Sequence, residues 1–318
     1  MENLKLATKR FNSKDTAEVL IEALPWIKAI TGKTVVIKYG GSVMTDPELR
    51  EAVVNDIVLM KIIGINPLIV HGGGKAISKA LEDAAIKFEF IDGTRATSPE
   101  AMNVVSKVLS GEVNQELVTA MNSHGNLAVG ITGCDAGTII AEAVSPELMR
   151  AGTITAINPA YIEDLISADY IPIVATIGLG EDGKAYNINA DEAAGKIASA
   201  IGAHKLIYLT DVDGIYRDFS DKSSLISNMT VESAKKLVDK KIVSSGMIPK
   251  LLSCIDALES GVYRGHIING TTPHSLLLEI LTNSGVGSVI HCSQEAYANE
   301  SHPLNNFALK LVENRDLR

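Results

Sequence analysis

From Lys33 onward, short apolar runs alternate with longer segments in which apolar residues recur every three or four positions. The runs are rich in β-branched residues and bounded by glycine, so they predict strands, while the periodic segments predict amphipathic helices. The expected strands are 34–39, 66–71, 126–133, 205–211, 264–270 and 287–291. The expected helices are 46–63, 75–86, 98–125, 190–202, 231–238, 247–261 and 273–280. This alternation predicts an α/β fold in which a mainly parallel sheet lies between helices.

Two parts of the chain depart from this alternation. Between residues 138 and 178 the strands become shorter and closer, which predicts an antiparallel flank. Residues 15–30 have apolar side chains at helical spacing, with Asp15 and Glu18 placed as in a capping box. No linker rich in proline, glycine or serine divides the chain, so we expect two lobes that share one sheet. The expected divisions are an N-terminal arm and helix at 1–32, lobes at 33–180 and 181–292, and a tail of unknown role at 293–318.

Composition narrows the class of protein. The 318 residues are 46% hydrophobic and carry a formal net charge of −9, without a cluster of lysine and arginine. Nucleic acid is therefore not an expected partner, because phosphate backbones are bound by basic patches. The first residues lack the apolar core of a signal peptide, and no apolar stretch approaches the roughly 18 residues of a membrane span. The three cysteines have no metal-binding spacing, so we expect a reduced, cytoplasmic protein without a metal site of its own.

The familiar nucleotide-binding motifs do not explain this sequence. Gly32-Lys33-Thr34 is the only triplet that could end a P-loop, but the leading glycine of that motif is replaced by Ile27. Gly178–Gly183 matches the GxGxxG pattern, yet it carries two acids and leads into an extended segment, which favours a hairpin turn over a dinucleotide loop. A nicotinamide-linked dehydrogenase is therefore a weak alternative. The protein-kinase motifs HRD and DFG are absent.

Four segments place glycine or charged residues directly after a strand or at the start of a helix. These segments are Lys38–Ser42, His71–Lys75, Asn187–Asp191 and Ser245–Lys250. The carboxyl ends of parallel strands meet at one edge of a sheet, and ligands of open α/β folds bind at that edge. We therefore expect the four segments to converge on one site.

The residue types in these segments favour an anionic ligand. Three consecutive glycines, Gly72–Gly74, exceed what a tight turn needs and expose N–H groups ahead of a helix N-terminus. Asn187, Asn189 and Asp191 alternate on one face of an extended segment; the alternative is that Asp191 only caps the next helix. Lys250 opposes the dipole at the start of a helix unless a negative partner lies near; the alternative is a solvated surface lysine. Two lysines, two glycine loops and an acid together indicate phosphoryl transfer.

The ordered motifs resemble those of the amino acid kinase family from about residue 16 to residue 291. They are VVIKYGG (35–41), VHGGG (70–74), GTR (93–95), NINADEAAGKIA (187–198), LTDVDGIY (209–216), GMIPK (246–250) and PHSLLLEILTNSGVGSVI (273–290). The resemblance implies a three-layer αβα sandwich around a mainly parallel open sheet, with an acyl-amino-acid-binding lobe at 33–180 and a lobe that binds ATP with Mg²⁺ at 181–292. The motifs are most similar to those of members that phosphorylate the γ-carboxylate of N-acetyl-L-glutamate in arginine biosynthesis.

The resemblance also implies roles for individual residues. Lys38 and Lys250 would neutralise the transferring phosphoryl group from opposite sides, and Asp191 would hold both lysines. The guanidinium of Arg95 would bind the α-carboxylate of the substrate. The other implied substrate ligands are Gly72, Gly73, Asn187 and Asn189, and the implied phosphate or nucleotide ligands are Gly40, Gly41, Thr210, Asp211, Gly246 and Met247. A substrate carboxylate is already ionised at neutral pH, so its attack on phosphorus needs no general base.

The sequence departs from the family pattern around the substrate. YGGS stands where YGGN is usual, Lys75 follows HGGG where proline is common, and RATS replaces RVTD. Another carboxylate or carbamate is therefore an alternative substrate. A catalytically silent, nucleotide-sensing regulator with the same fold is a second alternative, which the presence of both lysines and Asp191 disfavours.

Regulation and assembly are further expectations from the resemblance. The helix at 15–30 resembles the N-terminal helix of arginine-inhibited members, where it interlaces dimers into a hexamer; the alternative is a helix docked on its own subunit. His266, Glu279 and Gly285 fall where such members bind the inhibitor arginine. The alternative for His266 is a core histidine. The expected partners are small molecules and further copies of the chain, as a dimer or a hexamer.

Overall fold

The computed structural model describes residues 12–44, 46–282 and 285–293. The beginning of the predicted N-terminal arm and the predicted C-terminal tail after residue 293 lie outside the described residues.

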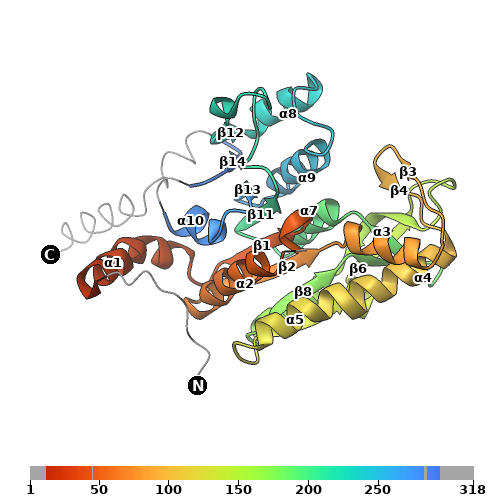
Figure 1. The fold of residues 1–318 in the computed structure, drawn as a ribbon, viewed down its shortest axis with the longest axis horizontal. Coiled ribbons are helices and arrows are strands. Elements are labelled where there is room, and N and C mark those ends of the chain that lie inside the picture. The colour runs from red at the N-terminus through yellow and green to blue at the C-terminus, as the bar shows by residue number, and fades with distance from the viewer. Residues whose placement is uncertain (1–11, 45, 283–284, 294–318) are drawn as a thin grey trace.

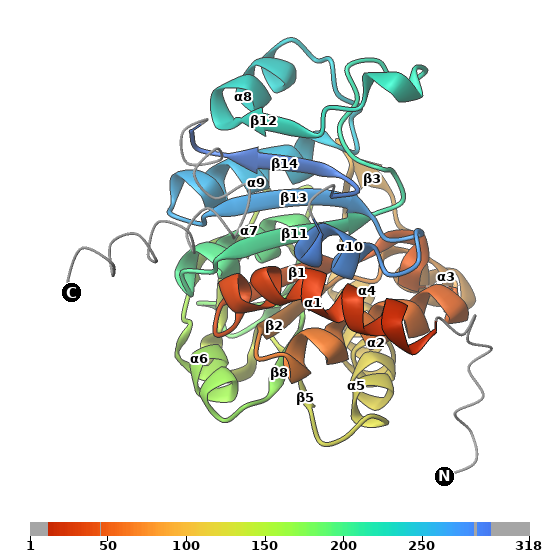
Figure 2. The same ribbon diagram turned by 90° about the vertical axis from the view of Figure 1, so that its left-hand side faces the viewer.

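A central sheet of eight strands runs through the molecule in the order β12-β14-β13-β11-β1-β2-β8-β5 (Figure 2). Its strands are β1 (Thr34–Tyr39), β2 (Asn66–His71), β5 (Ala128–Thr132), β8 (Ile171–Ala175), β11 (Lys205–Thr210), β12 (Asn228–Thr230), β13 (Arg264–Asn269) and β14 (Ser288–His291). All neighbours are parallel except β13 and β14. The mainly parallel sheet predicted from the apolar runs is confirmed.

Helices cover both faces of this sheet (Figure 1). One face carries α6 (Ala160–Ser167), α7 (Ala190–Ala200), α8 (Val231–Asp239) and α9 (Ile248–Glu259). The other face carries α2 (Pro47–Ile62), α5 (Asn114–Asn122) and α10 (Ser275–Leu281), with α1 (Ser13–Ile30) beside α10. Alternate residues of a strand face opposite sides, so Val36 packs with the α7 layer while Val35 and Ile37 pack with the α2 layer. The expected three-layer αβα sandwich is confirmed.

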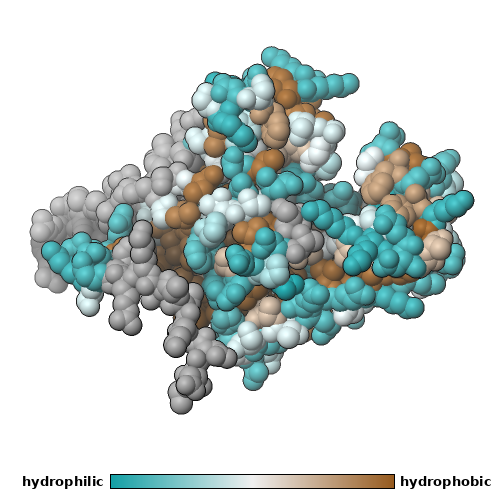
Figure 3. Space-filling model, viewed as in Figure 1, coloured by the Kyte–Doolittle hydropathy of each residue, from teal (hydrophilic) through white to brown (hydrophobic). Residues whose placement is uncertain are grey.

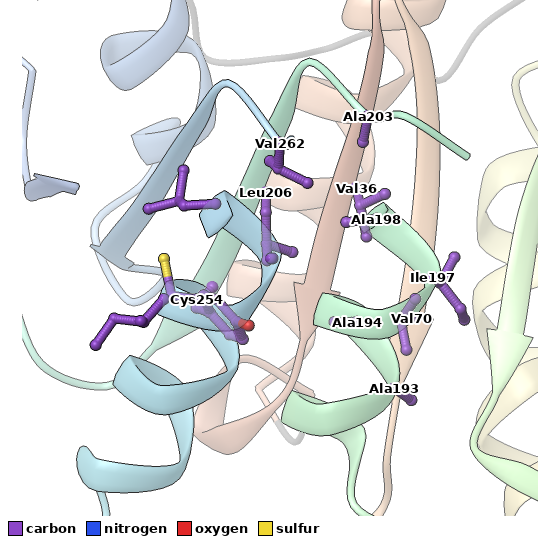
Figure 4. Packing of buried hydrophobic residues seen from close by; sticks show 14 of the residues in the cluster. Val36, Val70, Ala193, Ala194, Ile197, Ala198, Ala203, Leu206, Cys254 and Val262 are labelled. Carbon is purple, nitrogen blue, oxygen red and sulfur yellow. The ribbon is translucent and has the colours of Figure 1, made fainter. Parts of the chain in front are cut away.

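Small side chains of α7 pack against the central sheet. Figure 4 shows Ala198 of this helix beside Val36 of β1, and Ala193 and Ala194 near Val70 of β2. Ala193, Ala194 and Ala198 are fully buried. Small side chains let the helix approach the strands closely, which fixes where its N-terminus meets the edge of the sheet.

A helical segment from residue 99 to residue 122 lies beside α3 (Gly74–Asp83). It consists of α4 (Pro99–Ser106), a π-helical turn at Lys107–Val113, and α5. The sequence predicts one uninterrupted helix over 98–125, and the difference is this wider turn. A two-stranded hairpin, β3 (Phe90–Ile91) and β4 (Thr94–Arg95), stands between α3 and α4.

A small closed barrel extends one end of the molecule. It contains β6 (Ile139–Ala143), β7 (Ala151–Ile157), β9 (Ile177–Gly180) and β10 (Ala185–Ile188). The antiparallel flank is correct for β6 and β7, but β8 belongs to the parallel sheet between β2 and β5. β9 and β10 form an antiparallel hairpin around the Gly178–Gly183 segment, so the predicted hairpin turn is confirmed.

The first helix begins earlier than its predicted capping box. Asn12 caps α1 by accepting a hydrogen bond from the backbone N–H of Asp15, so Asp15 is not the cap. The helix continues through Pro25 to Ile30. No described helix combines the length and apolar character that crossing a membrane requires.

Candidate active site

A cleft of about 890 Å³ opens beyond the carboxyl ends of β1 and β2. Figure 3 shows the molecule hollowed between the part that carries α8 and α9 and the part that carries β3 and β4. Several residues predicted to bind substrate or phosphate line the cleft, namely Lys38, Gly40, Gly72, Gly73, Arg95, Asn187, Asn189 and Asp191. Pro249, from the fourth segment, also lines the cleft, so the four segments converge as expected, although the roles of their residues stay predictions.

Asp191 lies between two lysines at the centre of this site. Lys38, near the end of β1, places its Nζ 3.0 Å from Oδ1 of Asp191. Lys250, in the first turn of α9, places its Nζ 2.9 Å from Oδ2. The contact between Lys38 and Asp191 is an ion pair. The negative partner that the position of Lys250 requires is thus Asp191, and the alternative of a solvated surface lysine is wrong.

The charge of Asp191 is stabilised by its neighbours. Its side chain is 9% exposed, and burial alone would raise the pKa of the carboxyl group. The charges of Lys38 and Lys250 outweigh burial, so the pKa of Asp191 lies below its ordinary value. The carboxylate is therefore ionised at neutral pH and keeps both ammonium groups beside the cleft.

Asn189, and not Asp191, caps α7. Its side chain accepts hydrogen bonds from the backbone N–H groups of Asp191 (2.8 Å) and Glu192 (3.3 Å). This leaves the Asp191 side chain for the lysines. The alternative in which Asp191 only caps the helix is wrong.

Two glycine segments form the floor of the cleft near the lysines. A side chain at Gly40 would place its Cβ 2.7 Å from Nζ of Lys38, so glycine lets the ammonium group fold back toward Asp191. Gly41 begins a 3₁₀ turn that ends at Met44. Gly73 is the N-cap of α3 and provides no side-chain cap, so the first N–H groups of this helix have no acceptor among the described residues. Unsatisfied N–H groups at a helix N-terminus suit an anion.

Arg95 lies at the other end of the cleft. Its Nη2 donates hydrogen bonds to Gly74 O (3.1 Å) and Ser78 Oγ (2.8 Å). Its guanidinium carbon is 4.5 Å from the ring centroid of Phe88 and 4.6 Å from that of Phe90. Burial lowers the pKa of Arg95, but arginine stays charged at neutral pH. Its Nη1 is buried without a hydrogen-bond partner among the described residues, so this N–H group is available to a hydrogen-bond acceptor.

The remaining predicted ligands differ in their position relative to the cleft. Asn187 lines the cleft and donates from Nδ2 to Thr97 Oγ1 (3.2 Å). The predicted nucleotide ligands Thr210, Asp211, Gly246 and Met247 do not line it. Thr210 ends β11, the neighbour of β1, and the carbonyl of Gly246 lies 3.3 Å from Nζ of Lys250. Of these four residues, Gly246 therefore contacts Lys250 from outside the cleft.

Sequence reasoning missed a hydrogen-bonded support beneath Asp191. Ser253 of α9 donates from Oγ to the backbone carbonyl of Asp191 (2.7 Å), and Tyr208 of β11 donates to Ser253 Oγ (3.0 Å). A side chain at Gly195 of α7 would collide with Ser253. A glycine in the middle of a helix signals such a close approach, but it does not identify the residue it faces.

The three residues of the predicted arginine site also lie close together, where α10 packs against β13. None of them lines the cleft. His266 Nδ1 lies 2.7 Å from Glu279 Oε1, and a Cβ at Gly285 would contact Glu279 Oε2 at 3.1 Å. Lys205 Nζ lies 3.1 Å from His266 Nε2; because an ammonium group only donates, Nε2 accepts and His266 is neutral. Burial and the charge of Lys205 lower the pKa of His266 to about 4.

The chain is similar to known proteins in sequence. The model of the amino acid kinase family matches residues 33–269. An acetylglutamate kinase of Caldanaerobacter subterraneus subsp. tengcongensis is 51% identical over 276 residues, which are 86% of this chain and 92% of that protein. An acetylglutamate kinase of Heliobacterium modesticaldum is 46% identical, over 87% of this chain and 98% of that protein.

Solved structures share the fold. N-acetylglutamate synthase from Neisseria gonorrhoeae, complexed with coenzyme A and N-acetyl-glutamate, superposes with a TM-score of 0.78 at 24% identity. The match covers 87% of this chain, which spans 63% of the length of that protein. Carbamate kinase from Giardia lamblia, bound to citric acid, superposes with a TM-score of 0.63 at 17% identity, over 82% of this chain and 99% of that chain.

Proposed function

Because the chain belongs to the amino acid kinase family, we propose that it transfers the γ-phosphoryl group of ATP to the γ-carboxylate of N-acetyl-L-glutamate, a step of arginine biosynthesis. The observation that carries the proposal is the pair of lysines held on one buried carboxylate, Asp191, in a cleft whose far end presents Arg95. Relatives that match nearly their full length are acetylglutamate kinases, which supports this substrate over carbamate.

The proposed transfer is a displacement at phosphorus. An oxygen of the substrate γ-carboxylate forms a bond to the γ-phosphorus while the bond to the bridging oxygen of ADP breaks. No proton moves, and the products are an acyl phosphate and ADP. Charge spreads over the transferring group and its neighbouring oxygens, so Lys38 and Lys250 stabilise it from two sides. Asp191 fixes both ammonium groups before ATP binds, which lowers the cost of reorganisation.

The substrate is proposed to bind between Arg95 and the lysines. The free Nη1 of Arg95 would bind the α-carboxylate, while Nη2 stays anchored on Gly74 and Ser78. Asn187 and Asn189 would contact the acylated amino group, and Gly72 and Gly73 the reacting carboxylate and phosphate.

The nucleotide is proposed to lie on the other side of the lysines. Thr210, Asp211, Gly246 and Met247 would line its site, and the N–H groups of Gly40 and Gly41 would contact its phosphates. Mg²⁺ would enter with ATP and be coordinated mainly by phosphate oxygens. Among the described residues, no three acidic, histidine or cysteine side chains form a metal-binding cluster, and both oxygens of Asp191 already face ammonium groups.

The substrate assignment is tested by trapping the acyl phosphate with hydroxylamine. The panel contains N-acetyl-L-glutamate, L-glutamate, N-acetyl-L-aspartate, L-aspartate and carbamate, each with and without ATP. We expect ATP-dependent product with N-acetyl-L-glutamate at a rate far above the others. Faster product from another member would move the enzyme elsewhere in the family, and no product from any would favour a silent regulator.

Assembly through α1 is a second part of the proposal. Val19, Leu20, Ile21 and Leu24 of this helix are more than half exposed, and such an apolar face suits burial against a second copy. We propose that it interlaces dimers into a hexamer. Leu20→Asp with Leu24→Asp would then reduce the mass measured by light scattering to that of a dimer. An unchanged mass would favour a helix docked on its own subunit.

Feedback inhibition by arginine is the third part. The helix α10 carries Glu279 and lies beside α1, so the His266–Glu279 pair adjoins the proposed assembly face. An arginine guanidinium would compete with His266 for the Glu279 carboxylate. We expect millimolar L-arginine to lower the rate, and Glu279→Gln to weaken that inhibition. A flat response of the wild-type enzyme would contradict inhibition.

A further inference from the structure

Two buried polar side chains support the glycine loop after β2, which is formed by Gly72–Gly74. His71, the last residue of β2, is fully buried, and Asn114, the first residue of α5, is 2% exposed. His71 Nδ1 lies 3.1 Å from the carbonyl oxygen of Gly72, and His71 Nε2 lies 3.0 Å from Nδ2 of Asn114. Neither side chain is part of the two-lysine centre.

The hydrogen-bond partners determine which nitrogen of His71 carries the proton. Asn114 Nδ2 also lies 2.9 Å from the carbonyl of Ile173, which can only accept, so the amide group of Asn114 faces both partners as a donor. His71 Nε2 must then accept, and the proton must lie on Nδ1. Burial lowers the pKa of His71 to about 4, so the ring is neutral at physiological pH. Nδ1–H therefore donates to the Gly72 carbonyl.

This hydrogen bond sets the direction of the next N–H group. In a planar trans peptide the C=O and the N–H point in opposite directions. Holding the Gly72 carbonyl against the His71 ring therefore turns the Gly73 N–H away from the ring. Gly72 and Gly73 both line the cleft. Thr176 Oγ1 donates to the carbonyl of His71 (3.2 Å) and restrains the preceding peptide in the same way.

The π-helical turn at Lys107–Val113 supports the loop at a second point. A Cβ at Gly73 would lie 2.8 Å from Leu109 Cδ2, so this side chain is already packed against the loop. Leu109 is 1% exposed and also lines the cleft. The same turn leads directly into Asn114. A π turn is often found at functional sites because it changes which side chains face a given direction.

We propose that His71 and Asn114 are positioning residues, which together with the π turn hold the Gly72–Gly73 peptide so that its N–H faces the phosphoryl group being transferred. The catalytic part of this inference rests on the proposed kinase activity, but the anchoring of the peptide does not.

Asn114→Asp tests the proton on His71. An aspartate cannot donate from a charged oxygen, so it draws the proton to Nε2 and leaves two acceptors, Nδ1 and the Gly72 carbonyl, facing each other. At lower pH the His71 ring and the new carboxylate together take up a second proton. This proton restores Nδ1–H and its hydrogen bond to the Gly72 carbonyl, which orients the loop. The kcat of Asn114→Asp relative to wild type should therefore recover as the pH falls, by up to about tenfold per pH unit above the pKa of the pair.

Two further variants separate positioning from a general loss of stability. Asn114→Leu removes the donor without adding a titrating group, so its kcat should be lower than wild type by a similar factor at every pH, on the order of ten- to a hundredfold. Asn122→Asp makes the matched change on the same helix, where the hydrogen bonds of the Asn122 side chain to described residues go to the backbone of residues 127 and 128. Its kcat relative to wild type should not vary with pH. Identical pH profiles for Asn114→Asp and Asn114→Leu, or acid recovery in Asn122→Asp, would overturn the proposal.

A measurement on the unaltered protein covers the case in which the Asn114 variants do not fold. The full-length protein contains seven histidines, whose ring nitrogens are labelled with ¹⁵N and observed by NMR. The signals that are missing from the spectrum of His71→Gln belong to His71. We expect Nδ1 to be protonated and Nε2 unprotonated from pH 6 to pH 9. A proton on Nε2 would refute the anchor. If wild type forms no acyl phosphate, the proposed function fails while this measurement still decides the anchor.

Discussion

Replacing Asp191 with asparagine removes the charge that holds both active-site lysines while keeping the shape of the side chain. In the wild-type protein, Nζ of Lys38 and of Lys250 lie 3.0 Å and 2.9 Å from the two carboxylate oxygens. The side chains of Lys38 and Lys250 are only 12% and 18% exposed, so bulk solvent screens these contacts weakly. In Asp191→Asn the two ammonium groups repel one another and share no anion.

The expected loss follows from this geometry. Opposite charges about 3 Å apart attract by about 5 kcal/mol at an effective dielectric constant of about 20, although desolvation of the carboxylate offsets much of that energy. Losing one preorganised electrostatic contact to a transition state lowers kcat by roughly 10²–10³. Because both lysines depend on Asp191, we expect kcat to fall by at least about a hundredfold. The cleft gains one positive charge, so KM for ATP should not rise.

Steady-state kinetics with hydroxylamine trapping measure both quantities, and Glu192→Gln is the matched control. Glu192 is the next residue of α7 and loses the same charge, but its carboxylate accepts from Thr153 Oγ1 and Ile154 N instead of the lysines. Its kcat should fall much less. A kcat for Asp191→Asn within threefold of wild type, or an equal loss in Glu192→Gln, would refute the role of Asp191.

Three further outcomes are expected. Arg95→Lys should raise KM for the acylamino acid roughly tenfold or more, with KM for ATP unchanged, because lysine lacks the planar fork and the stacking of arginine; steady-state kinetics would contradict this if only KM for ATP rose. Gly40→Ala places a Cβ 2.7 Å from Nζ of Lys38, so kcat should fall by about tenfold or more, and an unchanged kcat would show that Lys38 tolerates displacement. The pKa of His71 is lowered from 6.5 to about 4 by burial, so the unfolded chain binds a proton that the folded chain does not as the pH falls from 6.5 to 4. The free energy of unfolding is therefore unaffected by this group above pH 6.5 and falls by about 3 kcal/mol as the pH is lowered to 4. The urea midpoint of His71→Gln should fall less in acid than the midpoint of wild type, and an equal fall in both proteins would count against the pKa shift.

Local sequence pattern predicted the strands that are buried on both faces. β1, β2, β11 and β13 are apolar runs bounded by glycine or polar residues, and their observed bounds differ from the expected ones by at most one residue. The pattern did not place β8, because its neighbours β2 and β5 are chosen by the tertiary fold. The sequence pattern also does not reveal the π turn, because one extra residue in a helical turn barely changes the spacing of apolar residues.

The site was predictable where it depends on the ends of strands and helices. Lys38, Asp191 and Lys250 meet because β1, α7 and α9 all end or begin at one edge of the sheet. The role of each side chain at that edge was less predictable. Asn189 and Asp191 are both good helix caps by type, and only the positions of the lysines decide between them. The partnership of His71 with Asn114 joins residues far apart in the chain and has no local signal.

The central claim is transfer of phosphate to one particular carboxylate, and the position of the trapped group tests it most directly. Wild-type protein is incubated with ATP, N-acetyl-L-glutamate and hydroxylamine, and tandem mass spectrometry locates the hydroxamate on the product. The account predicts an ATP-dependent γ-hydroxamate, with the α-carboxylate left free for Arg95. An α-hydroxamate, or no ATP-dependent product, would contradict it.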